Sequence, residues 1–327
     1  MPGIRRTFII GLAASLTSLV APLASADEER TPAAYPKAIE HSLGEAIISK
    51  EPDRIAVLGS TDADIVLALG KVPVLVNRWV PEWTYGVGPW AESYLHGQRP
   101  LMITSREISL ELVAASNPDL IVGSSTSLDA TMYSKLGLLA PTTAAPKEYP
   151  DPYTTPWDVE TLFVGKALNR EAQAQELVER TRLMFEKVRA DHPSWQGKSA
   201  ATLINWNGQV LMYAFSDNRG RFLKDMGFDM PADLKALTGG KFFAPISEER
   251  FDLFAKLDLI VVLTSSKQAR EFFERSQLFQ QLDIVKKGHV VYTDDLGLTM
   301  AMSASTVLSI PYVLDTLDKR IEQAIGK

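Results

Sequence analysis

Residues 39–58 read IEHSLGEAIISKEPDRIAVL, and the end of this stretch decides the fold class. Its last four residues, Ile55–Leu58, form a short apolar run that Gly59 closes. Val72–Val76 and Leu120–Val122 are two further short apolar runs. Short runs that are apolar throughout are typical of parallel strands buried on both faces. The stretch therefore predicts a parallel α/β sheet in the first half of the chain.

Helix-like segments alternate with these strands. Thr61–Leu69, between the first two strands, has Asp62 near its start and apolar residues inside, and Ile108–Ala115 precedes the third strand. Strand, helix and strand at this spacing indicate βαβ units. We therefore expect a Rossmann-like lobe that ends near residue 155.

The middle of the chain predicts a long helix. Thr155-Pro156-Trp157-Asp158 is a helix start, with a capping Thr, Pro in the first turn and a carboxylate three residues on. Asn169 interrupts the pattern, and apolar positions then recur at helical spacing from Arg170 to Ala190. A helix of about twenty residues spans roughly 30 Å. It is long enough to bridge two lobes before Pro193 stops it.

The second half repeats the α/β theme. Ala200–Ile204 and Val210–Tyr213 flank Asn207-Gly208, a strong hairpin-turn signal. Leu257–Leu263 is a further apolar strand, and Ala304–Ile325 is mainly a closing helix. The sequence therefore predicts a second α/β lobe.

The N-terminus has the order of an export signal. Arg5 and Arg6 precede the apolar run Phe8–Val20, and Ala24-Ser25-Ala26 provides small residues for cleavage after Ala26. The arginine pair leaves open whether export follows the general or the twin-arginine route. We expect a signal peptide at 1–26, an N-terminal lobe at 27–155, a linker helix at 156–192 and a C-terminal lobe at 193–327.

The composition excludes several classes of partner and functional site. The chain has 40 acidic against 34 basic residues and a formal net charge of −6, which argues against nucleic acid as a partner. It has no cysteine, which excludes disulfides, thiolate metal sites, a Cys nucleophile and a lipid-anchor Cys. We expect a periplasmic protein that is not inserted in the membrane. No common catalytic motif is present, so we expect no enzyme.

The positive functional signal is aromatic. Trp79, Trp83, Tyr85 and Trp90 lie close together in a Gly- and Pro-rich segment directly after the strand Val72–Val76. Loops at the carboxyl ends of parallel strands line the ligand crevice of α/β folds. The segment therefore predicts a binding loop for a large, partly apolar ligand. The alternative is that some of these rings anchor the loop to its own lobe.

Further candidates lie at other predicted loops. Ser60 and Ser124 follow two strands of the first half, where their hydroxyls could bind a polar ligand or cap helices. The second half adds Trp206, Tyr213, Arg219, Arg221 and Phe242. We interpret the two arginines as residues of a Gly-containing loop that recognise an oxyanion. The alternative is that they pair with Asp217 or Asp225.

Five segments in order along the chain resemble one known family. They are residues 39–59, 109–122, the mid-chain helix, 246–261 and 303–317. They resemble the substrate-binding proteins of ABC importers for iron-siderophores, haem and cobalamin. The first and last segments favour the ferric-siderophore branch.

The resemblance implies a class III substrate-binding protein of the helical-backbone metal-receptor type. Such a protein is an α/β fold in which two Rossmann-like lobes are bridged by a single long helix and hold the ligand between them. The implied function is to capture a ferric siderophore and deliver it to an ABC permease for iron uptake. The chelator would hold the iron, so the protein needs no metal ligand and no cofactor.

The resemblance also implies a docking surface. In the family, one glutamate on each lobe docks onto permease arginines, and Glu111 and Glu249 fall at the matching positions. Glu248 takes the second role if the alignment slips by one residue. We expect the protein to act as a monomer.

Two alternatives remain open. A haem carrier would need an axial ligand, for which Tyr85, Tyr94 and His96 are available. An exported hydrolase acting on such ligands is the other, although the chain lacks a recognisable nucleophile motif.

Overall fold

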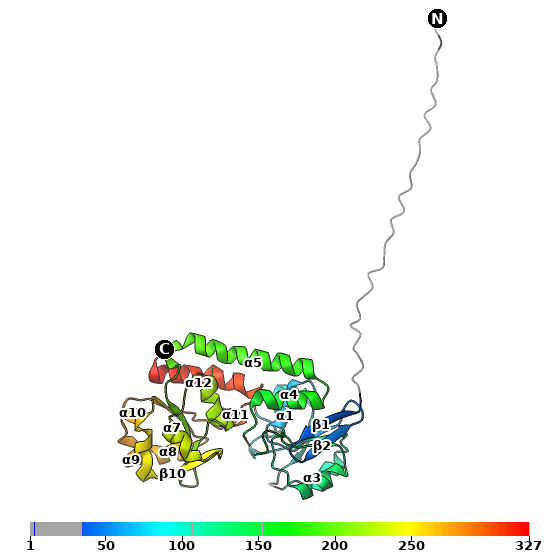
Figure 1. The fold of residues 1–327 in the computed structure, drawn as a ribbon, viewed down its shortest axis with the longest axis horizontal. Coiled ribbons are helices and arrows are strands. Elements are labelled where there is room, and N and C mark those ends of the chain that lie inside the picture. The colour runs from blue at the N-terminus through cyan, green and yellow to red at the C-terminus, as the bar shows by residue number, and fades with distance from the viewer. Residues whose placement is uncertain (1–2, 4–34, 106, 152, 327) are drawn as a thin grey trace. The chain divides into compact units, whose positions relative to one another are not determined.

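A computed structural model describes residue 3 and residues 35–105, 107–151 and 153–326. Apart from residue 3, the predicted signal peptide and its cleavage site lie outside the described residues. The described fold belongs to one compact unit, Ala34–Lys327, and Figure 1 shows its elements.

The first lobe is built on a parallel sheet with the strand order β5-β4-β3-β6-β7. The strands are β3 (Ile55–Val57), β4 (Leu75–Asn77), β5 (Leu101–Ile103), β6 (Leu120–Val122) and β7 (Thr142–Thr143). The helices α1 (Asp62–Ala68), α2 (Leu110–Ala115) and α3 (Ala130–Gly137) and the turn η1 (Glu92–Leu95) connect them. An antiparallel hairpin of β1 (Lys37–His41) and β2 (Gly44–Ile48) precedes the sheet. The predicted βαβ arrangement is confirmed.

The second lobe has a mixed sheet with the order β10-β9-β8-β11-β12. Its strands are β8 (Ala200–Trp206), β9 (Gln209–Tyr213), β10 (Phe243–Ile246), β11 (Leu259–Leu263) and β12 (Val290–Tyr292). β8, β11 and β12 are parallel, and β9 is antiparallel to both of its neighbours. The predicted hairpin turn is confirmed, because Asn207 and Gly208 both have positive φ between β8 and β9.

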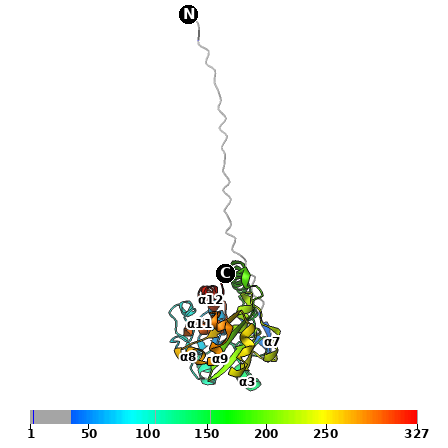
Figure 2. The same ribbon diagram turned by 90° about the vertical axis from the view of Figure 1, so that its left-hand side faces the viewer.

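Helices complete the second lobe. They are α6 (Asn218–Asp225), α7 (Ala232–Thr238), η3 (Glu248–Lys256), α8 (Lys267–Arg275), α9 (Gln277–Gln280), α10 (Asp283–Lys286), α11 (Leu296–Ala304) and α12 (Ser309–Ile325). The predicted closing helix is therefore two helices, because Ser305 adopts a left-handed conformation and ends α11. α11 and α12 lie against each other, which Figures 1 and 2 show from two sides.

Two helices occupy the segment between the lobes. α4 (Trp157–Ala167) packs on α1 of the first lobe, and α5 (Glu171–Asp191) is the long helix of the fold. Asn169, with a φ of 55°, interrupts the helical conformation between them, as the sequence predicted. Pro193 then begins the 3-10 turn η2 (Pro193–Trp195). Figure 1 shows α5 extending along both lobes beside α12.

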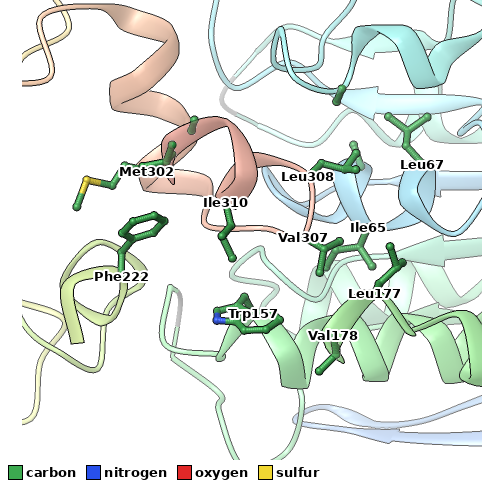
Figure 3. Close-up of a cluster of buried hydrophobic side chains, with 14 of the residues drawn as sticks. Ile65, Leu67, Trp157, Leu177, Val178, Phe222, Met302, Val307, Leu308 and Ile310 are labelled. Carbon is green, nitrogen blue, oxygen red and sulfur yellow. The ribbon is translucent and has the colours of Figure 1, made fainter. Parts of the chain in front are cut away.

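One hydrophobic core joins the two lobes. Figure 3 shows side chains of α1, α4, α5, α6 and the α11–α12 connection gathered in it. Trp157 of α4 and Phe222 of α6 are both nearly inaccessible to solvent. Each lobe also has a smaller core of its own. The packing between the lobes therefore resists large relative movement.

Candidate functional site

The carboxyl ends of the first-lobe strands lie at one edge of the sheet. The order of the strands places the loop after β4 between the loops after β3 and β5. Gly59, at the end of β3, leaves no room for a side chain, because a Cβ there would lie 2.1 Å from the Ser125 hydroxyl oxygen. The strand-end loops therefore pack closely at the edge where an α/β fold binds its ligand.

The aromatic loop forms a ladder of tryptophan rings. Trp83 packs edge-on against Trp79 and against Trp90, with ring centroids 5.3 Å apart in both pairs. Trp83 is only 5% exposed, whereas Trp79 and Trp90 are half-buried. Trp83 therefore anchors the loop, and the other two rings keep accessible surface. Tyr85 is also half-buried, with Arg99 over its ring at 5.7 Å.

Trp90 connects the ladder to the second lobe. Its indole Nε1 donates a hydrogen bond of 2.6 Å to Asp64, and its ring lies 5.8 Å from the ring of Tyr312 in α12. Tyr312 remains 40% exposed. Because Thr306 also donates to Asp64, over 2.6 Å, two contacts from the second lobe meet at this point. The rings and the Asp64 carboxylate therefore couple the lobes beside the predicted cleft.

A cluster of three buried carboxyl groups lies beneath this contact. Asp62 and Asp64 of α1 and Glu160 of α4 are all less than 5% exposed. Burial raises the pKa of Asp64 to about 6, although hydrogen bonds from Thr306 and Trp90 oppose the rise. Burial, and then the adjacent Asp62, raise the pKa of Glu160 well above its ordinary value. Carboxylates on helix faces are usually solvated, whereas these three are buried.

The two serine candidates differ in their surroundings. Ser124 is buried and donates a hydrogen bond of 2.5 Å to Asp62, which also accepts from the Ser125 backbone N–H. This hydroxyl serves the internal polar network. Ser60 is half-buried at the end of β3, next to the loop after β4.

Arg219 is at the centre of a buried cluster in the second lobe. Its guanidinium donates to both oxygens of Asp217, at 2.7 and 2.6 Å, and to the Tyr213 hydroxyl at 3.2 Å. It also stacks on the ring of Tyr213 at 3.9 Å and on that of Tyr153 at 5.2 Å. Phe242 extends the cluster, 5.6 Å from Tyr153. Three of the predicted site residues are therefore together, but Asp217 neutralises the arginine.

Arg221 uses its donors on the protein's own backbone. It bonds the carbonyls of Thr154 at 2.8 Å and Ser216 at 2.6 Å. The prediction that the two arginines lie in a loop is wrong, because both lie on α6. Gly220, which suggested the loop, is helical. It admits the carbonyl oxygen of Ala214, which would be 2.1 Å from a Cβ.

Trp206 stands apart from the other candidates of its lobe. It is 60% exposed at the β8–β9 hairpin and pairs with Gln209, whereas Tyr213 pairs with Thr202. Four residues of strand separate the two positions, or roughly 13 Å. The structure therefore does not bring Trp206 into the Arg219 cluster.

The predicted docking glutamates are both accessible. Glu111 lies in the first turn of α2 and Glu249 in the first turn of η3, and both are exposed. Glu248, the alternative to Glu249, accepts a hydrogen bond from the Ser276 hydroxyl. This internal bond favours Glu249 as the free carboxylate of the pair.

Sequence reasoning missed several residues of this region. Tyr153 and Tyr312 join the aromatic groups from segments outside the predicted binding loops. In the sequence, the three buried acids look like ordinary acidic residues in the first turn of a helix. Their burial depends on the packing of α1 against α4, which no local pattern reveals.

Two observations concern metals and membranes. Within the described ranges, no group of three or more His, Asp or Glu side chains is placed to hold a metal ion. No helix among the described residues combines the length and the apolar character needed to span a membrane.

Comparisons with known proteins agree with this architecture. A family model described as periplasmic binding protein matches residues 55–296. The ferric-anguibactin-binding protein FatB of Vibrio anguillarum is 24% identical over 300 residues, which are 88% of each chain. A periplasmic solute binding protein from Mycobacterium smegmatis superposes with a TM-score of 0.79, at 28% identity, over 88% of this chain and 98% of its own.

A second solved structure is PiaA of Streptococcus pneumoniae in complex with ferrichrome. It superposes with a TM-score of 0.76, at 26% identity, over 88% of this chain and 98% of that one. The matched family covers both lobes and the long helix, as the order of motifs in the sequence predicted. The chain belongs to the periplasmic binding protein family.

Proposed function

We propose that the protein captures a ferric siderophore between its two lobes and delivers it to the permease of an ABC importer. The observation that carries the proposal is the match, over both lobes, to relatives that bind such ligands, PiaA with ferrichrome among them. The accessible rings of Trp79, Trp90 and Tyr312 suit a bulky ligand, because flat apolar surface stabilises it by burial and stacking.

In this proposal the iron enters inside its chelator. The protein then contributes shape, aromatic surface and charge, and neither a metal ligand nor a cofactor of its own. Binding without chemical change is the expected activity, since the family is one of binding proteins. Export to the periplasm by the segment 1–26 is part of the proposal, as is action as a monomer.

Titration of tryptophan fluorescence tests the ligand class. Residues 27–327 are titrated with ferric catecholates, ferric hydroxamates, ferric citrate, haem and cobalamin. We expect quenching at micromolar or lower concentration by at least one ferric siderophore, recovered intact after incubation. Quenching by haem alone, with a Soret band, would replace the proposal with haem transport. Recovery of a cleaved ligand would point to a hydrolase.

A further inference from the structure

Arg78 lies at the carboxyl edge of the first-lobe sheet. It follows β4 directly, and its backbone N–H donates to the Ile103 carbonyl over 2.9 Å, which continues the ladder between β4 and β5. Strand alternation places its side chain on the same face as Val76. The aromatic loop covers this face, because a Cβ on Gly86 would lie 2.7 Å from Val76. Arg78 therefore has a fixed backbone at the base of the aromatic loop.

Among the described residues, the guanidinium of Arg78 is unpaired. Within the described ranges its side chain forms no hydrogen bond or ion pair, and its Nε is buried without an acceptor. Its two terminal guanidinium nitrogens also lack a partner in the described part of the chain but are not fully buried, so they reach solvent. Buried donors in native proteins are nearly always paired, and a buried unpaired one calls for an explanation such as a ligand.

The other half-buried arginines near the proposed cleft are already engaged. The Arg219 guanidinium donates hydrogen bonds to both carboxylate oxygens of Asp217. The Arg221 guanidinium donates to two backbone carbonyls and to the Asn218 side chain. Arg78 thus has no paired carboxylate within the described ranges, in a protein with a net charge of −6. The strand register places Gly59 on one side of Arg78 at the sheet edge and Thr104 on the other.

We infer that the cleft is built for an anionic ferric chelate and that Arg78 provides its counter-charge on the first lobe. The inference rests on the proposed function and deepens it by naming the charge of the ligand. Oxygen atoms of a chelate that carries excess carboxylate or catecholate charge accept hydrogen bonds from the guanidinium fork, while the accessible rings of the aromatic loop cover the apolar part. Arg78, and not Arg219 or Arg221, is then the cationic partner of the ligand.

The test uses two chelates of different charge and three variants. The chelates are an anionic ferric tris-catecholate and a neutral ferric tris-hydroxamate, both titrated by tryptophan fluorescence. Arg78→Gln removes the charge, and Arg78→Lys keeps the charge without the fork. Arg180→Gln is the matched control, because Arg180 is exposed on α5 and its loss changes the net charge equally.

Wild-type protein should prefer the anionic chelate. Arg78→Gln should weaken its binding by roughly tenfold or more, since a charge-assisted bidentate contact is lost, and should leave any binding of the neutral chelate within about twofold. Arg78→Lys should fall between wild type and Arg78→Gln. The affinity of wild type for the anionic chelate should also decrease more steeply with salt than that of Arg78→Gln.

The failures of the two claims can be told apart. If wild type binds a chelate but Arg78→Gln loses no more affinity than Arg180→Gln, the inference is wrong and the proposed function stands. An equal loss for the neutral and anionic chelates, or a preference of wild type for the neutral one, also overturns it. Wild-type protein that binds no ferric chelate overturns the proposed function and this inference together.

Discussion

The carboxyl groups of Asp62, Asp64 and Glu160 show how position changes the chemistry of a single residue. All three have the sequence context of ordinary helix acids, yet all are buried where the lobes meet. Asp64 accepts hydrogen bonds from Trp90 and Thr306, which favour its charged form, while burial favours its neutral form more strongly. Its charge state therefore affects the contact between the two lobes.

Asp64 should make stability depend on pH. Because burial raises its pKa from 3.8 to about 6, folding favours the protonated acid. Its stabilising contribution is complete below about pH 4 and is lost as the pH rises through about 6, a change of up to roughly 3 kcal/mol. Asp64→Asn mimics the neutral acid, so its free energy of unfolding should rise relative to wild type between pH 4 and pH 7. Urea denaturation at several pH values measures the difference, and a constant difference would contradict the shift.

Arg219 should matter for folding rather than for recognition. Arg219→Met leaves the buried Asp217 carboxylate unpaired, which should lower the free energy of unfolding by about 3–5 kcal/mol. Adding Asp217→Asn should restore part of this loss, because the remaining group is neutral. Guanidinium denaturation measures both variants. A loss below about 1 kcal/mol, together with weaker binding of an anionic chelate, would return Arg219 to the ligand site.

The accuracy of predictions for single residues depended on whether the local sequence determines the contacts of the side chain. The two arginines were correctly noticed as unusual, and pairing with Asp217 was one of the alternatives left open. Their helix was missed because Gly220 is a loop signal in sequence, whereas its function is to admit the Ala214 carbonyl. Arg78 lies two residues beyond the predicted strand Val72–Val76, yet only the three-dimensional contacts show that it lacks a partner among the described residues.

The aromatic loop shows how an irregular element acquires a defined conformation. It has no regular structure between β4 and η1, and ring contacts order it instead. Gly88 is essential to this packing, since a Cβ there would lie 2.3 Å from the Trp90 ring. The glycines and prolines that identified the loop in the sequence thus include one that shapes its surface.

Gly88→Ala should displace the Trp90 ring and break its hydrogen bond to Asp64. We expect a changed near-UV circular dichroism spectrum, a loss of about 1–3 kcal/mol in stability from overpacking, and weaker ligand binding. Gly137→Ala is the control, because a Cβ at that helical glycine meets nothing within 4 Å. A Gly88→Ala spectrum that matches both the wild type and the control would show that the ring adapts without cost.

Regular elements were the most predictable part of the chain. Periodicity placed the long helix at 170–190, and α5 runs from Glu171 to Asp191. The continuous apolar runs located β3 and β6 because burial on both faces leaves no polar positions, and the run Val72–Val76 overlaps β4, which ends at the polar Asn77. The break at Ser305 was missed, since a left-handed serine has no strong signal in sequence.

The whole molecule combines a packed interface with exposed docking positions. The shared core and the Asp64 contacts hold the lobes together, while Glu111 and Glu249 remain free on different lobes. The order of motifs in the sequence was sufficient to predict this architecture, but not which aromatic rings face solvent, because ring orientation depends on tertiary packing.

The docking assignment predicts a separation of binding from transport. Glu111→Ala and Glu249→Ala should leave chelate affinity within about twofold of wild type, since exposed carboxylates contribute little to the fold. Both should lower iron uptake in cells that depend on this protein. Glu179→Ala, an exposed glutamate on α5, is the matched control. Normal uptake by the double variant would refute the docking role.

The tryptophan ladder also has an optical consequence. Trp79, Trp83 and Trp90 are in ring contact, so excitation absorbed by one indole migrates among the three before emission. Trp206, exposed on its separate hairpin, emits from an aqueous environment and at longer wavelength. A ligand that touches one ring of the ladder would therefore quench the emission of three indoles together, and one that touches Trp206 would quench only the long-wavelength emission.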